Sequence, residues 1–256
     1  MSTPDFVIDT NRMIDLDGVK MLVLADTREA LLPGTRDISE EIPGRDGELD
    51  FGTEFEPRII ELHVAVPTAV GWLVPGNTTV HTKEHIKATI AKHFNPKDGI
   101  KILQWEGSPD RYYHVKYSGS IESYKEHPMW LEYTIPLKMP DPYIYSAAEH
   151  ISSISGSTQL LNAGTVDTPV VVEVVGGTNP AITISSTAYG SQVMEWTGDL
   201  SGGTLVIDTD KMTVTLNSDN AVSGYNNNFP LLPPGESTVT QSGGTSVSVK
   251  WRDRWI

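Results

Sequence analysis

Apolar and polar residues alternate along much of the chain with a period of two. In RIIELHVAV, residues 58–66, every second side chain from Ile60 onward is apolar, and Glu61 and His63 fall on the opposite face. This alternation predicts antiparallel strands with one face on a core and the other in water. The segments YYHVKYSG and WLEYTIPLKM repeat it, with the inward set Tyr113, Val115, Tyr117, Leu131, Tyr133, Ile135 and Leu137.

A different period marks the segment TKEHIKATIAKHF. Ile86, Ile90 and Phe94 recur at helical spacing, Thr82 can cap the first turn, and Asn95-Pro96 predicts the end of the helix. A helix with a single apolar stripe is expected to lie across one face of a sheet. The first part of the chain is therefore predicted to be an α+β domain, a sheet or β-sandwich with one helix.

The composition changes after the proline-containing segment MPDPYIYSAAEH, residues 139–150. Between Lys138 and Lys250 the only basic residue is Lys211, and Ser, Thr, Gly and Val dominate. The short strands predicted there are PVVVEVV, AITIS, QVMEW, TLVID, MTVTL, STVTQ and SVSVKW, separated by turns such as GGTNP and SGGT. Such spacing is typical of a β-sandwich. We predict a mainly β protein with two domains, residues 1–140 and 141–256.

Charge and composition exclude several classes of function. The formal charge is −14, and the first 57 residues hold 5 basic and 14 acidic side chains. Nucleic-acid binding needs a basic surface, so DNA is expected to pass such a protein without binding. The absence of cysteine excludes disulfides, thiolate metal sites and a cysteine nucleophile. No apolar run reaches the ~20 residues of a membrane-spanning helix, and the beginning MSTPDFVIDT does not resemble a secretory signal.

The stretch IPGRDGELDFG, residues 42–52, gathers acidic side chains between glycines. Asp46, Glu48 and Asp50 have the spacing of the first half of a calcium loop, but Phe51 and Pro57 stand where that loop needs glycine and glutamate. Two carboxylates at this spacing also suit a glycosidase, although no apolar surroundings mark either as an acid catalyst. We favour a turn followed by a strand whose carboxylates face water.

Other candidate chemistry is weak. His81, His85 and His93 share a helix face that suits zinc, but Lys83 and Lys87 would repel a cation. No nucleophile elbow, phosphate loop or dinucleotide fingerprint occurs, so we predict no enzyme, no catalytic residue, no metal and no cofactor. In the sandwich, four aromatic residues can either stack on a sugar ring or pack inside the core: Tyr189, Trp196, Tyr225 and Trp251.

Three segments, taken in order, carry a family likeness. IPGRDGELDFGTEFEPRIIELHVAV joins a proline–glycine turn, an Asp-Gly step and an arginine to an alternating strand, and MPDPYIYS places Asp-Pro-aromatic at the domain junction. GGTLVIDTDKMTVTLNSDN, followed by NNFPLLPPGESTVT, is a strand, an acidic turn, a strand and a proline–glycine turn. With the ending VSVKWRDRWI, the chain resembles the distal tail protein (Dit) family of siphophages over essentially its whole length.

The resemblance implies a structural protein of the virion, made in the cytoplasm of the host. The first domain would assemble head-to-tail into a homo-hexameric ring at the distal end of the tail tube, and the second would be a galectin-like β-sandwich. The ring would connect the tube to the baseplate or tail tip and let DNA pass without specific binding. Its partners would be the tail tube protein, the tail-associated lysin or tail fibre, the tape measure protein and receptor-binding proteins.

On this interpretation IPGRDGELDFG is a turn and an extended arm in the assembly interface, and Arg45 pairs with an acid of its own chain or of a neighbour. The predicted interface residues are Pro43, Gly44, Arg45, Asp46, Gly47, Glu48 and Asp50. The alternative function, a host cell-wall glycan-binding module in the second domain, stays open. The chain lacks the long insertions that serve some family members as carbohydrate-binding modules, and a galectin-like fold alone does not imply sugar binding.

Overall fold

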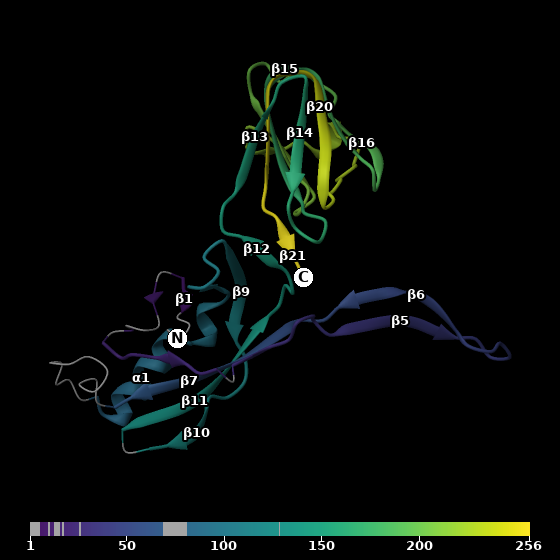
Figure 1. Cartoon of the computed structure of the whole chain (residues 1–256). Coiled ribbons are helices and arrows are strands. Elements are labelled where there is room, and N and C mark those ends of the chain that lie inside the picture. Colours follow the sequence, from purple (N-terminus) through teal and green to yellow (C-terminus); the bar gives the residue numbers. More distant parts are fainter. Residues whose placement is uncertain are drawn as a thin grey trace. The chain divides into compact units, whose positions relative to one another are not determined.

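The computed structural model describes residues 6–9, 11, 12, 16, 18–25, 27–68, 81–127 and 129–256. The chain divides into two compact units, the first ending at Ile144 and the second running from Tyr145 to Trp255 (Figure 1). The boundary predicted from composition lies four residues earlier, after residue 140. The described residues are mostly β-structure, as the alternating pattern predicts, with one α-helix where the helical spacing predicts it.

The sheet of the first unit runs in the order β2-β1-β8-β9-β11-β7-β3, with β10 beside β11 and β4 beside β7. Its longest pairing joins β7 to β11, from Arg58 opposite Met139 to Pro67 opposite Trp130. The bounds are β1 (Phe6–Ile8), β2 (Asn11–Arg12), β3 (Leu22–Val23), β4 (Arg28–Glu29), β7 (Arg58–Pro67), β8 (Lys101–Trp105), β9 (Arg111–Tyr117), β10 (Glu122–Glu126) and β11 (Trp130–Met139).

The predicted inward residues form the core of this unit. The even-numbered apolar residues of β7 and the odd-numbered residues of β11 from Leu131 are buried, as are Ile86 and Ile90 of the helix. Because one face of each strand is apolar and the other polar, the alternation alone fixes which side packs inward. The predicted inward positions are confirmed except for Tyr117, which is only half-buried.

Helix α1 (Lys83–His93) also follows its sequence signals. Thr82 Oγ1 accepts a hydrogen bond from the His85 backbone amide at 3.2 Å, and Ile86 and Ile90 are buried. A short 3₁₀ turn, η3 (Pro96–Asp98), succeeds the helix. No helix within the described ranges is long and apolar enough to cross a bilayer.

The second unit is built around two long strands, β15 (Val170–Ser186) and β20 (Gly235–Trp251), which pair along their whole length. The sheet order is β13-β20-β15-β17-β18-β19, with β14 beside β20 and β16 beside β15. The remaining bounds are β12 (Ile144–Ser146), β13 (His150–Ile154), β14 (Ser157–Asn162), β16 (Gly190–Glu195), β17 (Thr204–Asp208), β18 (Thr213–Leu216), β19 (Asp219–Asn220), η4 (Val222–Gly224) and β21 (Arg254–Trp255).

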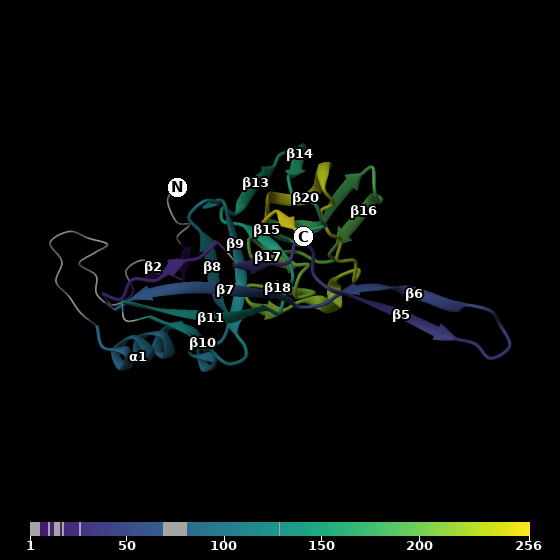
Figure 2. The ribbon, with the colours of Figure 1, turned by 60° about the horizontal axis from the view of Figure 1, so that its bottom comes forward.

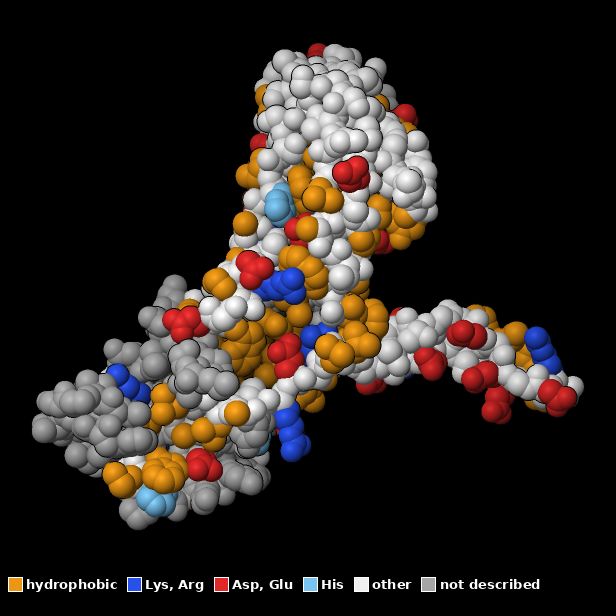
Figure 3. Space-filling model, in the orientation of Figure 1, with side chains coloured by type: hydrophobic (Ala, Val, Ile, Leu, Met, Phe, Trp, Pro, Cys, Tyr) orange, Lys and Arg blue, Asp and Glu red, His pale blue; other side chains and the backbone are white. Residues whose placement is uncertain are grey.

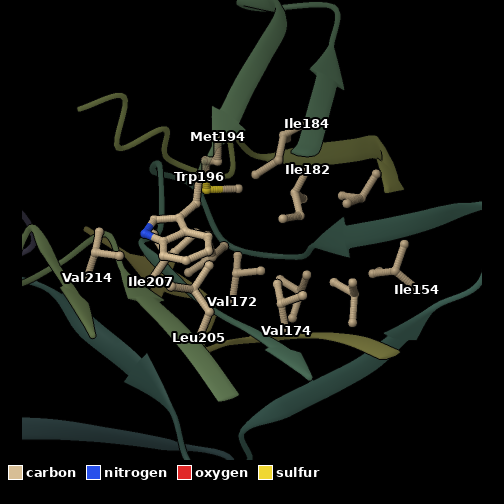
Figure 4. Close-up of a cluster of buried hydrophobic side chains, with 14 of the residues drawn as sticks. Ile154, Val172, Val174, Ile182, Ile184, Met194, Trp196, Leu205, Ile207 and Val214 are labelled. Atoms are coloured by element: carbon tan, nitrogen blue, oxygen red, sulfur yellow. The ribbon is translucent and has the colours of Figure 1, made fainter. Parts of the chain in front are cut away.

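The sheet folds over its own core at two glycine-rich positions. The pairing of β15 with β20 shifts register between Gly177 and Ala181, opposite Gly244 and Ser242. Beyond this point Ile182 and Ile184 face Val172 and Val174 across a common cluster of buried side chains (Figure 4). The segments GGTNP and SGGT are therefore bends inside continuous strands, and the prediction of separate strands on either side was wrong.

The C-terminal residues hold the beginning of the second unit in place. β21 pairs with β12, and Arg252 Nη1 donates to the carbonyl oxygens of Ser146 at 3.0 Å and Ala147 at 2.6 Å. The guanidinium of Arg254 lies over the ring of Tyr145, 5.0 Å from its centre. Tyr145, the second tyrosine of MPDPYIYS, is thus held against the last strand of the chain.

Candidate functional site: the β5–β6 hairpin

Between β4 and β7 the chain leaves the sheet as a hairpin of its own. β5 (Thr35–Glu41) pairs with β6 (Glu48–Phe55), from Thr35 opposite Phe55 to Glu41 opposite Glu48. Every residue of the two strands except Leu49 is exposed, and no other strand of the described residues pairs with them. The hairpin projects from the first unit in both views (Figures 1 and 2).

The predicted assembly residues form the tip of this hairpin and the start of β6. Pro43 to Gly47 make the turn, which is closed by a hydrogen bond from the Arg45 amide to the Ile42 carbonyl at 3.1 Å. Gly44 and Gly47 have φ of 84° and 81°, a region that other residues enter at a cost. Glu48 and Asp50 follow on β6. The turn thus owes its shape to its glycines.

One face of the hairpin is apolar. Directly opposite residues of an antiparallel pair point to the same side, and successive residues to opposite sides. The register, with a bulge between Asp37 and Ser39, therefore places Ile38, Leu49 and Phe51 together. Ile38 is 41% and Phe51 62% exposed, although both are large apolar side chains. A contiguous exposed apolar surface of this kind usually marks a contact with another protein.

The opposite face is acidic. It carries Asp37, Glu41, Glu48 and Asp50, and acidic side chains follow the hairpin along its length in Figure 3. Thr53 donates to Asp37 at 2.7 Å, and the Gly52 amide donates to Asp50 at 2.8 Å, so this face is held by its own hydrogen bonds. Between Thr35 and Glu56 there are eight Asp and Glu residues against two arginines.

The ion pairs of the hairpin lie within it. Arg36 pairs with Glu54 on the apolar face, and this hydrogen bond raises the pKa of Arg36. Arg45, by contrast, has no ion-pair partner within the described part of the chain. Of the two partners predicted for Arg45, an acid of its own chain or one of a neighbour, the described residues supply none within the chain, and the pairing with a neighbour stays a prediction.

The geometry does not assemble a metal or catalytic centre here. Glu48 accepts from Ser39 Oγ at 2.5 Å, so it and Asp50 each serve a structural hydrogen bond of the hairpin. At the start of α1 the ring of His85 stacks on that of His81, which precedes the helix, with their centres 5.0 Å apart. His81 Nε2 lies 2.9 Å from the Gly18 carbonyl oxygen. Across the residues that are described, no group of three His, Asp or Glu side chains is placed to hold a metal ion.

The four aromatic residues considered for sugar stacking do not form a surface. Trp196, Tyr225 and Trp251 are buried and belong to the core cluster of the second unit (Figure 4 labels Trp196). Rings enclosed by the core cannot lie flat on a pyranose, so for these three residues the structure supports the core alternative. Tyr189 is exposed, and its hydroxyl donates to Asp167 at 2.5 Å.

Sequence reasoning missed a buried charge at the root of the hairpin. Arg58, the first residue of β7, is only 2% exposed, and its Nη1 lies 3.6 Å from Glu29 Oε1 at the end of β4. Arg58 lies two residues before Ile60 and four before Leu62, so the alternating pattern already placed it on the inward face of β7. An arginine at an inward position of a strand was the sequence feature that could have predicted this buried charge.

Comparisons with known proteins agree over both units. A family model described as a phage tail protein RIFT-related domain matches residues 15–138, and one described as the C-terminal domain of a siphovirus-type tail component matches residues 163–255. The crystal structure of the Dit protein of phage SPP1, titled a paradigm of the hub adsorption apparatus in phages infecting Gram-positive bacteria, superposes with a TM-score of 0.74 at 13% identity, covering 99% of each chain.

A more distant likeness is found in the baseplate of phage P2 in its activated conformation with calcium, with a TM-score of 0.45 at 8% identity and 98% of each chain covered. A sequence comparison with curated proteins gives no match. The shared fold and the two family models thus account for nearly all of the chain.

Proposed function

Because the chain belongs to the distal tail protein (Dit) family of siphophages, we propose that it forms a hexameric ring at the distal end of the tail tube. The ring connects the tube to the baseplate or tail tip, and it leaves a central passage for DNA. The protein acts by assembly, as a structural component of the virion, and performs no chemical reaction.

The observation that carries this proposal is the hairpin with its uncovered apolar face. Ile38 and Phe51 are exposed on a segment that makes no sheet with the rest of its chain. Burying them against a neighbouring copy would contribute about 25 cal/mol for each Å² of apolar surface removed from water. A copy that offers its hairpin to a different surface of the next copy makes a heterologous contact, which closes into a ring when the rotation allows.

The charge supports passage of DNA without binding. The formal charge of −14, with eight acidic residues on the hairpin segment, makes the chain as a whole repel a phosphate backbone. The partners that we propose are the tail tube protein on one side and the tail-associated lysin or tail fibre on the other. The tape measure and receptor-binding proteins are further candidates.

Light scattering coupled to gel filtration, with negative-stain images, tests the ring. The purified chain should form six-fold rings, alone or with the tail tube protein. Phe51→Asp should abolish them, because it charges the apolar face, whereas Asp37→Asn on the other face should leave them intact. Circular dichroism checks that both variants stay folded. A chain that remains monomeric at every concentration with its partner present would refute the proposal.

A further inference from the structure

We propose that the apolar face of the hairpin seats in a groove beside helix α1 of a second copy of the chain, with Glu40 meeting Lys87 at the rim. This inference rests on the proposed ring and names the surface that receives the hairpin. Two features of the described residues carry it. One is a matching apolar hollow in the first unit, and the other is a complementary distribution of charge.

The receiving groove lies between α1 and the sheet. A hollow of about 340 Å³ is lined by Lys87, Ile90, Ala91, Ile121 and Tyr133. Its walls are mostly apolar, while Lys87 and Ala91, one helical turn apart, are exposed on the same side of α1.

The charges on the two surfaces are opposite in sign. The segment from His81 to Lys101 holds five lysines against Glu84 and Asp98. Lys101 is bonded to Asp98, and Lys87 is the lysine that lines the groove. Lys87 has no ion-pair partner within the described ranges. On the hairpin, Glu40 lies directly opposite Leu49 and so stands on the apolar face. An acidic residue beside an apolar patch fits a lysine beside an apolar groove.

The two surfaces are also placed for head-to-tail assembly. In both views of the first unit, the hairpin and α1 lie at opposite ends of it (Figures 1 and 2). Each copy then gives one hairpin and receives one, which is the arrangement that closes a ring of identical subunits. With the apolar face covered, the carboxylates of Asp37, Glu41, Glu48 and Asp50 stay outside the contact.

Cysteine pairs can test this contact without interference, because the natural chain contains no cysteine. Glu40→Cys combined with Ala91→Cys should form intermolecular disulfides under mild oxidation and give a ladder of oligomers on non-reducing gels. Glu41→Cys with Ala91→Cys is the matched control, since Glu41 is the next residue, also an exposed glutamate, and points to the other face. Cross-linking of the control pair should be at least fivefold weaker.

Charge reversal gives an independent measure. Lys87→Glu should weaken self-association on the order of fivefold, the upper range for an exposed pair, and Glu40→Lys in the same chain should restore it. Lys97→Glu makes the same change of net charge outside the groove and should have little effect.

The outcomes separate this inference from the ring itself. If rings form while the Glu40/Ala91 pair links no better than its control, the groove is the wrong partner and the ring stands. If Glu40→Lys fails to rescue Lys87→Glu, the proposed pairing at the rim is wrong. If no oligomer forms and neither cysteine pair links, both proposals fall together.

Discussion

The guanidinium of Arg58 lies 3.6 Å from the carboxylate of Glu29, and the two residues flank the hairpin in the sequence. Glu29 ends β4 before the hairpin begins, and Arg58 starts β7 after it ends. Tyr113 adds a hydrogen bond to Glu29. Burial raises the pKa of Tyr113 to about 12, so its phenol stays protonated at neutral pH. The entry and exit strands of the hairpin are thus joined by an ion pair in which Arg58 is buried and Glu29 is partly exposed.

Removing the carboxylate should destabilise the first unit strongly. Glu29→Gln leaves the guanidinium of Arg58, only 2% exposed, without its counter-charge, and breaking such a pair costs about 3 kcal/mol or more. Arg58→Met should cost less, because Glu29 is 29% exposed and can be hydrated. Urea unfolding followed by tryptophan fluorescence measures both.

The double variant Glu29→Met/Arg58→Met supplies the control. It removes both charges and the desolvation that each requires, so its stability should lie within about 1 kcal/mol of the natural chain. Equal losses in all three variants would mean that the pair acts through packing and not through charge.

Two glycines permit the close crossing of the long strands of the second unit. Gly177 has φ of 101°, and a Cβ added there would lie 1.9 Å from the carbonyl oxygen of Gly243. Gly177→Ala should therefore lower the free energy of unfolding by about 3 kcal/mol, through backbone strain and overpacking together. Circular dichroism with heating gives the change in Tm.

Gly156 is the matched position. It also has positive φ, 68°, but an added Cβ would meet nothing within 4 Å. Gly156→Ala should show only the strain, about 1 kcal/mol. If the two variants lose the same amount of stability, then the short distance from Gly177 to Gly243 is not the reason that glycine is needed at position 177.

The alternating pattern predicted the strands that have one apolar and one polar face. It failed for strands that are exposed to water on both faces. Ile60 to Val66 alternate with polar residues, so the core face could be read directly from the sequence. β5, TRDISEE, is exposed on both faces and carries only Ile38 as an apolar residue, so no alternation marks it. The apolar face of the hairpin arises only when Ile38 meets Leu49 and Phe51 across the pairing, which is information that no single strand holds.

The breaks predicted within β15 and β20 were wrong for another reason. Glycine favours both tight turns and the close approach of two backbones, and the sequence does not distinguish these uses. Gly177 and Gly243 serve the second, so β15 and β20 continue through segments that read as turns. The aromatic residues raise a similar ambiguity, because Trp196 suits a core or a sugar site equally until its neighbours are known.

The turn between β17 and β18 should make stability depend on pH. Burial on its own raises the pKa of Asp208. Its carboxylate, however, accepts hydrogen bonds from Lys211 Nζ at 2.6 Å and from the backbone amides of Asp210 and Lys211. These bonds outweigh the effect of burial, and the pKa is lowered below 3.8. A lowered pKa means that the folded state favours the carboxylate. The stabilisation is therefore present above pH 3.8 and is lost as the pH falls through the folded pKa.

Asp208→Asn should lower the free energy of unfolding at pH 7 by about 1–2 kcal/mol. The difference from the natural chain should shrink as the pH drops below 3.8. Asp219→Asn, a neighbouring exposed aspartate on β19, should change little at any pH. Urea denaturation repeated from pH 2.5 to 7 measures the free energy of unfolding of each protein. A difference between Asp208→Asn and the natural chain that does not vary with pH would rule out the ionised carboxylate as its source.

Trp196 separates a core role from a sugar-binding role in the second unit. The residue is 9% exposed, its Nε1 donates to the Ala221 carbonyl at 3.1 Å, and a Cβ on Gly198 would lie 2.5 Å from its ring. Trp196→Ala should therefore cost about 3–5 kcal/mol of stability, as expected when a large buried ring is removed. Tyr189→Ala should cost less than about 0.5 kcal/mol, because that ring is 52% exposed.

Binding to host cell walls, measured on the same variants, separates the two roles. Any loss of binding in Trp196→Ala should match the fraction of that variant that is unfolded. A folded Trp196→Ala protein that loses glycan binding at unchanged stability would show that the indole faces a ligand after all, because only a ring outside the core can be removed without destabilising it.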